Sequence, residues 1–480
     1  MRFSVILRYV GTVMLCLSAI MAVSAGISYA SGDTGFYPLL LSALLTLLLG
    51  GFPMIFVSKA DSITTKEGFM IVVGSWVVSC VVGMFPYLIW GGEFSLVNAW
   101  FESVSGFTTT GASILTNIEA LPQGLLFWRS ATNWIGGVGV VMFALLVLPS
   151  LGTNKMALSG IEMSSLAKDN YRYRTQKVAK ILLTIYIGLT IISTLALKLA
   201  GMRWFDALNH AMSASATGGF STKNASIGFY DSPLIEWILI AVMFLSSLHY
   251  GLIYSTFTRK SNNIFRSEVV RVYVAIIVGA TLFIATSLYF ADIYPNIFTS
   301  LRQSVFQTVS LITTTGFATA DTNLWTPFAV VILIILSIIC GCAGSTSGGA
   351  KVDRILLYFK VLVARLRGQQ HPNAVIRIRL DGILQEDRQV NTVTLFLTTY
   401  FVLILLGTLT STLLGLDLLT AFSSSVAFIG NVGPGFGAVG SLDNYAELPS
   451  LLKIQGSVLM LMGRLEIFGF IQFLFIRMWR

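Results

Sequence analysis

The chain has 480 residues, of which 55% are hydrophobic and 11% are charged, and its mean hydropathy is +0.79. Because soluble domains carry about 25% charged residues, this composition excludes a soluble globular protein and indicates a membrane protein. We interpret the formal net charge of +9 as an orientation signal in membrane loops, with no nucleic acid as a partner.

Ten apolar segments predict ten transmembrane helices. Two of them, 181–197 and 454–476, are shorter or interrupted by Arg464 and Glu466. The other eight lack Asp, Glu, Lys and Arg and approach or exceed the ~20 residues that cross a bilayer. These eight are residues 9–31, 34–58, 68–92, 130–154, 237–258, 272–291, 322–350 and 389–416. The first segment is long and the second follows almost at once, so we expect no cleaved signal peptide.

Charged residues alternate between successive loops. By the positive-inside rule we expect a multi-pass protein of the cytoplasmic (inner) membrane, in contact with its lipids and with both termini in the cytoplasm. An acidic outer face would favour cation entry. The expected inner set is Arg2, Arg8, Lys59, Lys66, Lys155, Lys168, Arg172, Arg174, Lys177, Lys180, Arg259, Lys260, Arg266, Arg271, Lys351, Arg354, Lys360, Arg365, Arg367, Arg377, Arg379, Arg477 and Arg480.

An internal repeat lies in the expected outer loops. Four short apolar segments, each too short to span, end in Thr/Gly-rich sequence: Trp100–Gly111, Met212–Phe220, Ser310–Phe317 and Phe428–Gly435. Aligned on Gly111, Gly218, Gly316 and Gly433, they recur at intervals of 107, 98 and 117 residues, with a polar residue nine positions earlier: Glu102, Asn209, Gln307 and Ser424. A long apolar span precedes and follows each copy.

This repeat predicts the domain organisation. The fold class is an all-α polytopic membrane protein, in which four helix–pore half-helix–helix repeats in a pseudo-fourfold arrangement follow two N-terminal transmembrane helices. The expected boundaries are 1–66 for the leading helices, 67–154, 155–258 and 259–364 for the first three repeats, and 365–480 for the fourth.

The Thr/Gly segments predict a cation-binding site. Non-helical backbone at membrane depth is tolerated where it lines a cavity, and rings of carbonyl oxygens there can replace the water shell of a monovalent cation. Glycine permits the required backbone angles, and the negative end of each half-helix faces the ion. The expected ligands are Thr109, Thr110, Gly111, Ala216, Thr217, Gly218, Thr314, Thr315, Gly316, Asn431, Val432 and Gly433.

A second candidate site lies after the third copy. The apolar run from Pro327 is broken by Gly341–Lys351, near the middle of the membrane or deeper, where glycines oppose a continuous helix. The break predicts either a flexible loop or an ordinary kink against a neighbouring helix. The residues of this break that we single out are Gly341, Gly344, Ser345, Thr346, Ser347, Gly348 and Gly349.

Two arginines lie in apolar surroundings. Arg464, inside the last span, is a functional candidate because ionisable residues are costly in a bilayer. It lies only two positions from Glu466, so the two do not face each other on a helix; a snorkelling side chain is the alternative. Arg129 is expected to fix the first half-helix through Glu102, as scaffold rather than ion contact.

These motifs resemble the Trk/Ktr/HKT superfamily of potassium transporters, and TrkH-type membrane subunits in particular. The similarity covers essentially the whole chain: Thr108–Gly111, Thr313–Gly316, Ala216–Phe220 and Asn431–Gly435 match the family's filter motifs, and the two leading spans match the TrkH type. The resemblance implies potassium as the transported ion, since Gly111 stands where serine accompanies sodium transport. It also implies a gating loop contacted by Arg464, so the expected gating residues are Gly341, Gly344, Ser345, Thr346, Ser347, Gly348, Gly349 and Arg464.

The resemblance further implies partners. It predicts a homodimer with one pore in each subunit and a cytoplasmic ring of TrkA-type nucleotide-binding regulatory subunits. The chain has no dinucleotide or P-loop fingerprint, so nucleotide control would come from that partner. The inner loops 155–180 and 365–390 are either its docking sites or plain orientation signals.

Three other functions stay open, and one of them, a solute carrier with inverted repeats, would not need four Thr-Gly turns. The other two are closer to the motifs. One is a sodium-permeable or weakly selective monovalent cation channel of the same superfamily, since Val432 stands where the other aligned copies have threonine. The other is an intramembrane protease using Ser345 or Ser347, which would need a basic or acidic partner that no motif supplies. We therefore expect a transporter and not an enzyme, whether passive or coupled to protons or sodium as a symporter.

Overall fold

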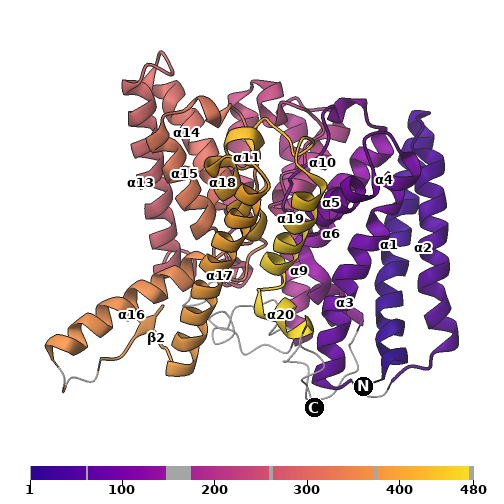
Figure 1. Cartoon of the computed structure of the whole chain (residues 1–480), viewed down its shortest axis with the longest axis horizontal. Coiled ribbons are helices and arrows are strands. Elements are labelled where there is room, and N and C mark those ends of the chain that lie inside the picture. Colours follow the sequence, from indigo (N-terminus) through magenta and orange to yellow (C-terminus); the bar gives the residue numbers. More distant parts are fainter. Residues whose placement is uncertain are drawn as a thin grey trace.

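The structure is a computed structural model that describes residues 2–60, 63–147, 175–258, 263–371, 373 and 376–474. Two long antiparallel helices, α1 (Phe3–Ser31) and α2 (Phe36–Phe56), form one edge of the molecule (Figure 1). A Cβ added at Gly11 would lie only 2.7 Å from the carbonyl oxygen of Gly50. The two helices therefore approach each other closely through small residues, as membrane helices do.

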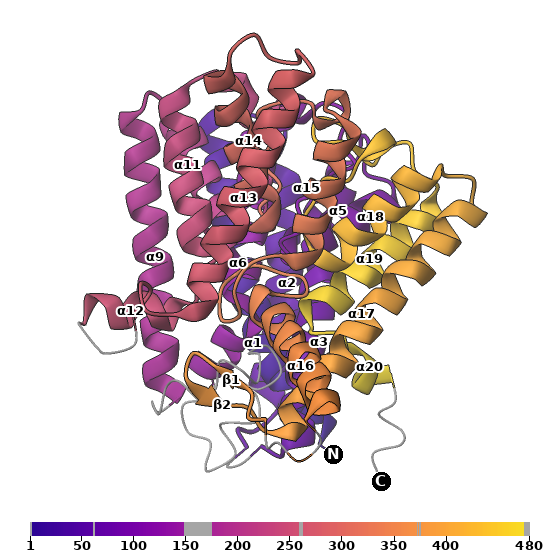
Figure 2. The ribbon, with the colours of Figure 1, turned by 90° about the vertical axis from the view of Figure 1, so that its left-hand side faces the viewer.

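Four groups of helices follow (Figures 1 and 2). The first comprises α3 (Thr65–Gly83), α4 (Phe85–Trp90), α5 (Leu96–Phe107) and α6 (Gln123–Val147). The second comprises α9 (Thr175–Leu199), α10 (Trp204–Ala216), α11 (Pro233–Ser246) and α12 (Tyr250–Phe257). The third comprises α13 (Glu268–Phe290), α14 (Ile297–Ile312), α15 (Pro327–Ile339) and α16 (Val352–Gln370). The fourth comprises α17 (Asp387–Leu413), α18 (Leu418–Gly430), α19 (Ser450–Arg464) and α20 (Phe468–Leu474).

The half-helices α5, α10, α14 and α18 are short, with 12, 13, 16 and 13 residues. At about 1.5 Å per residue they reach only part of the way through a bilayer. Side chains cap three of them: Ser95, Asn296 and Asp417 accept hydrogen bonds from backbone N–H groups of the first turn. Bonds from Thr420 hold the pKa of the Asp417 carboxyl below its usual value.

Ten candidate spans were expected, with a break after the one that begins at Pro327, and in the structure the helix that follows every half-helix is broken. Among the described residues, six helices are long and apolar enough to cross a membrane, or seven if the bent pair α11–α12 counts as one. The rest are broken: α6 at Gly139, α11–α12 by a 99° bend, α15–α16 by residues 340–351, and α19–α20 by Leu465–Ile467. All four breaks lie in the second helix of a repeat.

One small feature was absent from the all-α prediction. A two-stranded antiparallel hairpin, β1 (Arg379–Leu380) and β2 (Ile383–Leu384), lies in the expected inner loop 365–390. Gly382, with φ 80°, supplies the left-handed residue that the tight turn needs. The beginning of α1 and the end of α20 lie at the same end of the molecule as this hairpin (Figure 1).

Candidate functional site

All four half-helices end in the same backbone turn. The left-handed residue is Thr109, Thr217, Thr314 or Asn431, with φ between 52° and 60°. The next residue donates its N–H to the carbonyl five positions back, as Thr110 does to Ser105 and Val432 does to Ala427. This is the Schellman arrangement that satisfies the last carbonyls of a helix. The sequence repeat is thus also a repeat of backbone geometry.

The alignment of the second copy is corrected by one residue. A glycine with positive φ follows two positions after each left-handed residue: Gly111, Gly219, Gly316 and Gly433, with φ 78°, 74°, 76° and 103°. Gly219, not Gly218, is therefore the counterpart of Gly111. Ala216 is the last residue of α10 and lies one position before the matched segment.

The four segments meet in a closed ring. A Cβ added at Gly111 would clash with the carbonyl oxygen of Gly218 in the second copy, and one at Gly219 with that of Thr315 in the third. A Cβ at Gly316 would clash with the Val432 oxygen, and one at Gly433 with the Thr110 oxygen of the first copy. The four copies thus follow one another around the ring, and the contact that closes it joins Thr110 and Gly433, which are 323 positions apart in the chain. Only glycine allows these close contacts.

The corrected alignment changes which side chains are shared. At the left-handed position all four copies carry a side-chain oxygen, on Thr109, Thr217, Thr314 and Asn431, and all four residues are buried. At the next position only the first and third copies have threonine, because Gly218 and Val432 stand in the others. The sequence alignment indicated that Val432 alone lacks the threonine of this position, but Gly218 lacks it too.

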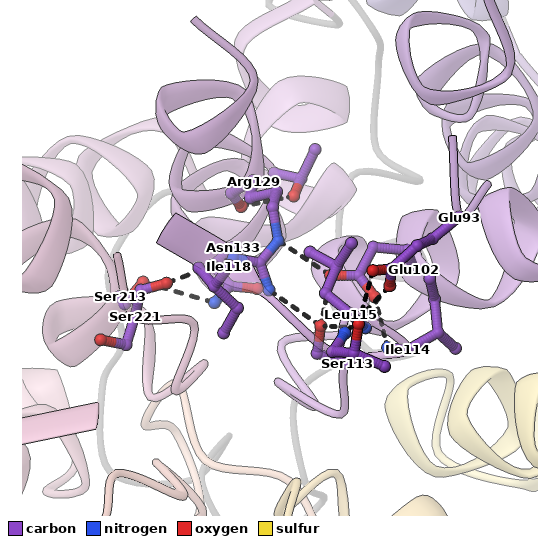
Figure 3. Close-up of polar contacts among 12 residues, drawn as sticks. Glu93, Glu102, Ser113, Ile114, Leu115, Ile118, Arg129, Asn133, Ser213 and Ser221 are labelled. Carbon is purple, nitrogen blue, oxygen red and sulfur yellow. Dashed lines mark hydrogen bonds and ion pairs between the residues drawn. The ribbon is translucent and has the colours of Figure 1, made fainter. Parts of the chain in front are cut away.

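A buried ion pair stabilises the first two copies (Figure 3). Arg129, on α6, donates from Nε to Glu102 Oε1 on α5 at 2.8 Å, and the two side chains are 1% and 0% exposed. The guanidinium also donates to Ser113 Oγ at 3.1 Å and to the Ser221 carbonyl at 3.2 Å. Because Ser113 and Ser221 follow Gly111 and Gly219 by two positions, Arg129 joins corresponding points of both segments. The expected Arg129–Glu102 contact is confirmed.

His210 is a residue that the sequence analysis missed. It lies nine positions before Gly219, where Glu102 lies relative to Gly111, so it replaces Asn209 in the corrected alignment. Its Nε2 atom is 2.9 Å from Ser221 Oγ, as Glu102 Oε1 is 3.0 Å from Ser113 Oγ. The same polar brace thus recurs in two copies with different residue types.

One side-chain hydrogen bond joins the fourth copy to the first, and two others hold the fourth copy within its own repeat. Asn431 Nδ2 donates to Thr110 Oγ1 and to the Met460 carbonyl, both at 3.0 Å. The Tyr445 hydroxyl donates to the Gly433 carbonyl at 2.7 Å. Asn431 was expected from its place in the motif, whereas Tyr445 lies outside every motif and was missed.

Residues 340–351, here called the loop, form the predicted break (Figure 2). Thr346 Oγ1 donates to the Ser215 carbonyl of α10 at 3.3 Å. Ser347 Oγ donates to the Thr313 carbonyl at 3.2 Å, and the Gly348 N–H donates to Thr314 Oγ1 at 3.1 Å. The loop therefore lies against the C-terminal ends of the second and third half-helices.

The remaining loop residues that we expected to act in gating hold its shape. The Gly344 carbonyl accepts from the Tyr250 N–H at 3.2 Å, and Ser345 Oγ donates to the Cys342 carbonyl at 2.6 Å. Gly344 and Gly349 have φ 75° and 70°, and the Gly341 carbonyl accepts from the Val352 N–H at 3.0 Å. Ser345 and Ser347 thus donate to carbonyls, with no basic or acidic side chain as their recorded partner.

Arg464 lies at the end of α19, beside the loop. Its Nη1 donates to the Thr346 carbonyl at 2.8 Å, and its Nη2 donates to the Gly136 carbonyl of α6 at 2.5 Å. Glu466 instead pairs with Arg354 at the start of α16, a contact that the sequence analysis did not predict. The end of α19 and the break that follows it therefore contact the middle of the loop and the first turn of α16.

Some expected inner residues lie outside the described part of the chain. They are Lys155, Lys168, Arg172, Arg174, Arg259, Lys260, Arg477 and Arg480.

Comparisons with known proteins agree with this geometry. The family model of TrkH, described as a cation transport protein, matches residues 40–478. The Trk system potassium uptake protein TrkH of Salmonella typhimurium is 36% identical, and that of Escherichia coli 35%, over the full length of both chains. The crystal structure of the potassium transporter TrkH from Vibrio parahaemolyticus is 33% identical, with TM-score 0.90 over all of both chains. The chain belongs to the TrkH family of cation transport proteins.

Proposed function

We propose that this protein takes up potassium ions across the cytoplasmic membrane through a selectivity filter built from the four Thr/Gly segments. The observation that carries the proposal is the closed ring of backbone contacts through Gly111, Gly219, Gly316 and Gly433. Carbonyl oxygens arranged around such a ring can replace the hydration shell of a potassium ion. The relatives' names, all potassium uptake proteins or transporters, support the same ion.

The proposed filter residues are Thr109–Gly111, Thr217–Gly219, Thr314–Gly316 and Asn431–Gly433. The negative ends of the half-helices would lower the energy of a cation bound at the inner end of the ring. The ion pair of Glu102 with Arg129 would fix the first segment relative to the second without contacting the ion.

The loop is the proposed gate. Its hydrogen bonds to Ser215, Thr313 and Thr314 support a closed position against the inner ends of the half-helices. Two loop glycines with positive φ, Gly344 and Gly349, permit a change of backbone course. Arg464 would hold this closed position through Thr346.

The proposed orientation has both chain ends and the hairpin in the cytoplasm. Described basic residues at that end include Arg2, Lys66, Arg365, Arg367 and Arg377, in agreement with the positive-inside rule. Potassium would then enter at the N-terminal ends of the half-helices and leave past the loop.

Two partners belong to the proposal. The exposed apolar side chains of α16, Tyr358, Phe359, Leu362, Val363 and Leu366, would contact a second copy of the chain. The basic inner end would contact a nucleotide-binding regulatory subunit of the TrkA type. Release of the loop by that subunit would couple nucleotide binding to ion flux.

A weakly selective cation channel is the second candidate. It is favoured by the mixed position after the left-handed residue, where Thr110 and Thr315 alternate around the ring with Gly218 and Val432. A ring with two missing hydroxyls could discriminate less well between sodium and potassium.

Uptake of rubidium into a potassium-transport-deficient bacterium tests both candidates. The native chain should restore growth at low potassium and take up rubidium, with sodium a poor competitor. Gly316→Ser should lose selectivity over sodium. Transport of neither ion would contradict the assignment, whereas equal transport of both would favour the weakly selective channel.

A further inference from the structure

The loop occupies oxygen atoms at the inner ends of the half-helices. The Ser215 carbonyl lies at the end of α10, and the Thr313 carbonyl lies directly after α14. Each accepts a hydroxyl hydrogen from the loop, from Thr346 and Ser347. Gly348 also packs against the Gly430 carbonyl at the end of α18, where an added Cβ would lie 2.5 Å from the oxygen. Three half-helices therefore end against the loop.

One loop contact involves a proposed filter side chain. The Gly348 N–H donates to Thr314 Oγ1 at 3.1 Å. Thr314 is the left-handed residue of the third copy, one of four that carry a buried side-chain oxygen at this position. An oxygen that accepts this hydrogen bond is less available to a cation, because both use its lone pairs.

A positive charge also accompanies the closed loop. The guanidinium of Arg464 contacts the Thr346 carbonyl of the loop and the Gly136 carbonyl of α6. A Cβ added at Gly136 would clash with the carbonyl of Phe107, the last residue of α5. The end of the remaining half-helix thus lies beside the carbonyl that Arg464 binds. Loop donors and this guanidinium together provide the hydrogen bonds and positive charge that these helix ends favour.

We infer that a potassium ion at the inner end of the filter and the closed loop compete for the same oxygen atoms, which include Thr314 Oγ1 and the helix-end carbonyls. Ion binding at this position therefore favours release of the loop, and loop closure lowers the affinity of the position for the ion. The inference rests on the proposed function, because it requires that these segments bind potassium. It adds a response of the gate to the transported ion itself.

Native cysteines report on the loop. Cys340 and Cys342 lie in it and are 0% and 2% exposed, so a thiol reagent reaches them only when the loop moves. Cys80, on α3, is also 0% exposed but lies outside the loop, and it serves as a matched control within the same chain. The labelling rate of each cysteine with N-ethylmaleimide can be followed by mass spectrometry on the full-length protein in liposomes.

Labelling is measured in potassium and in choline at constant ionic strength. If the ion binds only when the loop is released, potassium about 10-fold above its dissociation constant should raise the Cys340 and Cys342 rates about 11-fold. Choline, too large for the site, should leave them unchanged, and Cys80 should not respond to either cation. Equal loop labelling in the two cations would overturn the inference.

Substitutions distinguish the effect of ion binding from the effect of loop closure. Ser347→Ala removes a loop donor but no proposed ligand, so loop labelling should rise in both cations while the potassium-to-choline ratio is retained. Thr314→Val removes the shared oxygen, so the ratio should fall toward one. Thr398→Val, on an exposed face of α17 where the hydroxyl bonds only its own helix, should change neither quantity. A native ratio in Thr314→Val would contradict the role of this oxygen.

Rubidium uptake by the same liposomes distinguishes failure of the inferred competition from failure of the proposed function. Uptake together with cation-independent labelling would leave the proposed function intact and remove the competition. Absence of uptake by the native protein would remove the proposed function itself.

Discussion

Arg464 donates a hydrogen bond to the carbonyl oxygen of Thr346 at 2.8 Å, although the two residues are 118 positions apart in the chain. The same guanidinium donates to the Gly136 carbonyl of α6 at 2.5 Å. One side chain of the fourth repeat thus holds the loop of the third repeat against the kinked helix of the first. A change at this position should act on the loop without altering the ring of glycines.

Arg464→Gln should favour the open loop. Loss of a charge-assisted hydrogen bond costs about 1.5–3 kcal/mol, which corresponds to a shift of about 10- to 150-fold in an equilibrium constant. We expect faster rubidium efflux from liposomes and unchanged selectivity over sodium. Arg388→Gln, at the exposed start of α17, is the matched control and should behave as the native protein. Slower efflux in Arg464→Gln would count against a holding role.

Glu466→Gln should loosen the end of the loop through its partner Arg354. The side chain of Arg354 is 6% exposed and that of Glu466 18%. Removing one partner of a buried pair costs about 3–5 kcal/mol, and we expect the lower end because Glu466 is partly exposed. Thermal unfolding in detergent measures this loss. The control is Glu268→Gln, which breaks the pair with Lys360, a residue of α16 like Arg354. Both side chains of this pair are about a third exposed, so the variant should lose at most about 1 kcal/mol of stability. An equal loss in the two variants would exclude a special role for Glu466.

The sequence was sufficient for the repeat but not for its register. In Ala216–Phe220 two glycines are adjacent, and matching on Thr-Gly selects Gly218. Which glycine takes the positive φ depends on where α10 ends, and helix ends are set by backbone hydrogen bonds that the sequence pattern does not show. One signal was present: His210 and Ser221 have the spacing of Glu102 and Ser113.

The breaks in the second helices were predictable only in part. The glycines before Gly139 and those in the loop signal irregular backbone. The 99° bend between α11 and α12 falls at Ser247–His249, which contains no glycine or proline. There the Ser247 hydroxyl lies 2.8 Å from the Tyr273 hydroxyl, and the Ser247 carbonyl accepts a hydrogen bond from the Cys342 N–H at 3.0 Å. Tertiary contacts stabilise this bend, so local sequence could not predict it.

The corrected register predicts that Gly219→Ala is more damaging than Gly218→Ala. An added Cβ at Gly219 meets the backbone carbonyl of Thr315, and its φ of 74° costs a non-glycine residue about 1–2 kcal/mol. At Gly218 the added Cβ meets the side chain of Asn133, with Nδ2 at 2.5 Å and Cβ at 2.9 Å, and φ is not in the left-handed region. Rubidium uptake should be lost in Gly219→Ala, as in Gly111→Ala, and should be reduced less in Gly218→Ala. The opposite order would restore the original alignment.

Glu102→Gln should destabilise the protein by leaving Arg129 buried without its carboxylate. The pair is almost fully buried, and loss of one partner costs about 3–5 kcal/mol. The double variant Glu102→Gln/Arg129→Met should be more stable than Glu102→Gln alone, because it removes the uncompensated charge. Glu119→Gln, which breaks the partly exposed pair with Lys223, is the control and should cost at most about 1 kcal/mol.

Since Arg129 also contacts the segments through Ser113 and Ser221, the double variant should regain thermal stability but not the native preference for rubidium over sodium. Native selectivity in the double variant would reduce Arg129 to a structural residue with no influence on the filter.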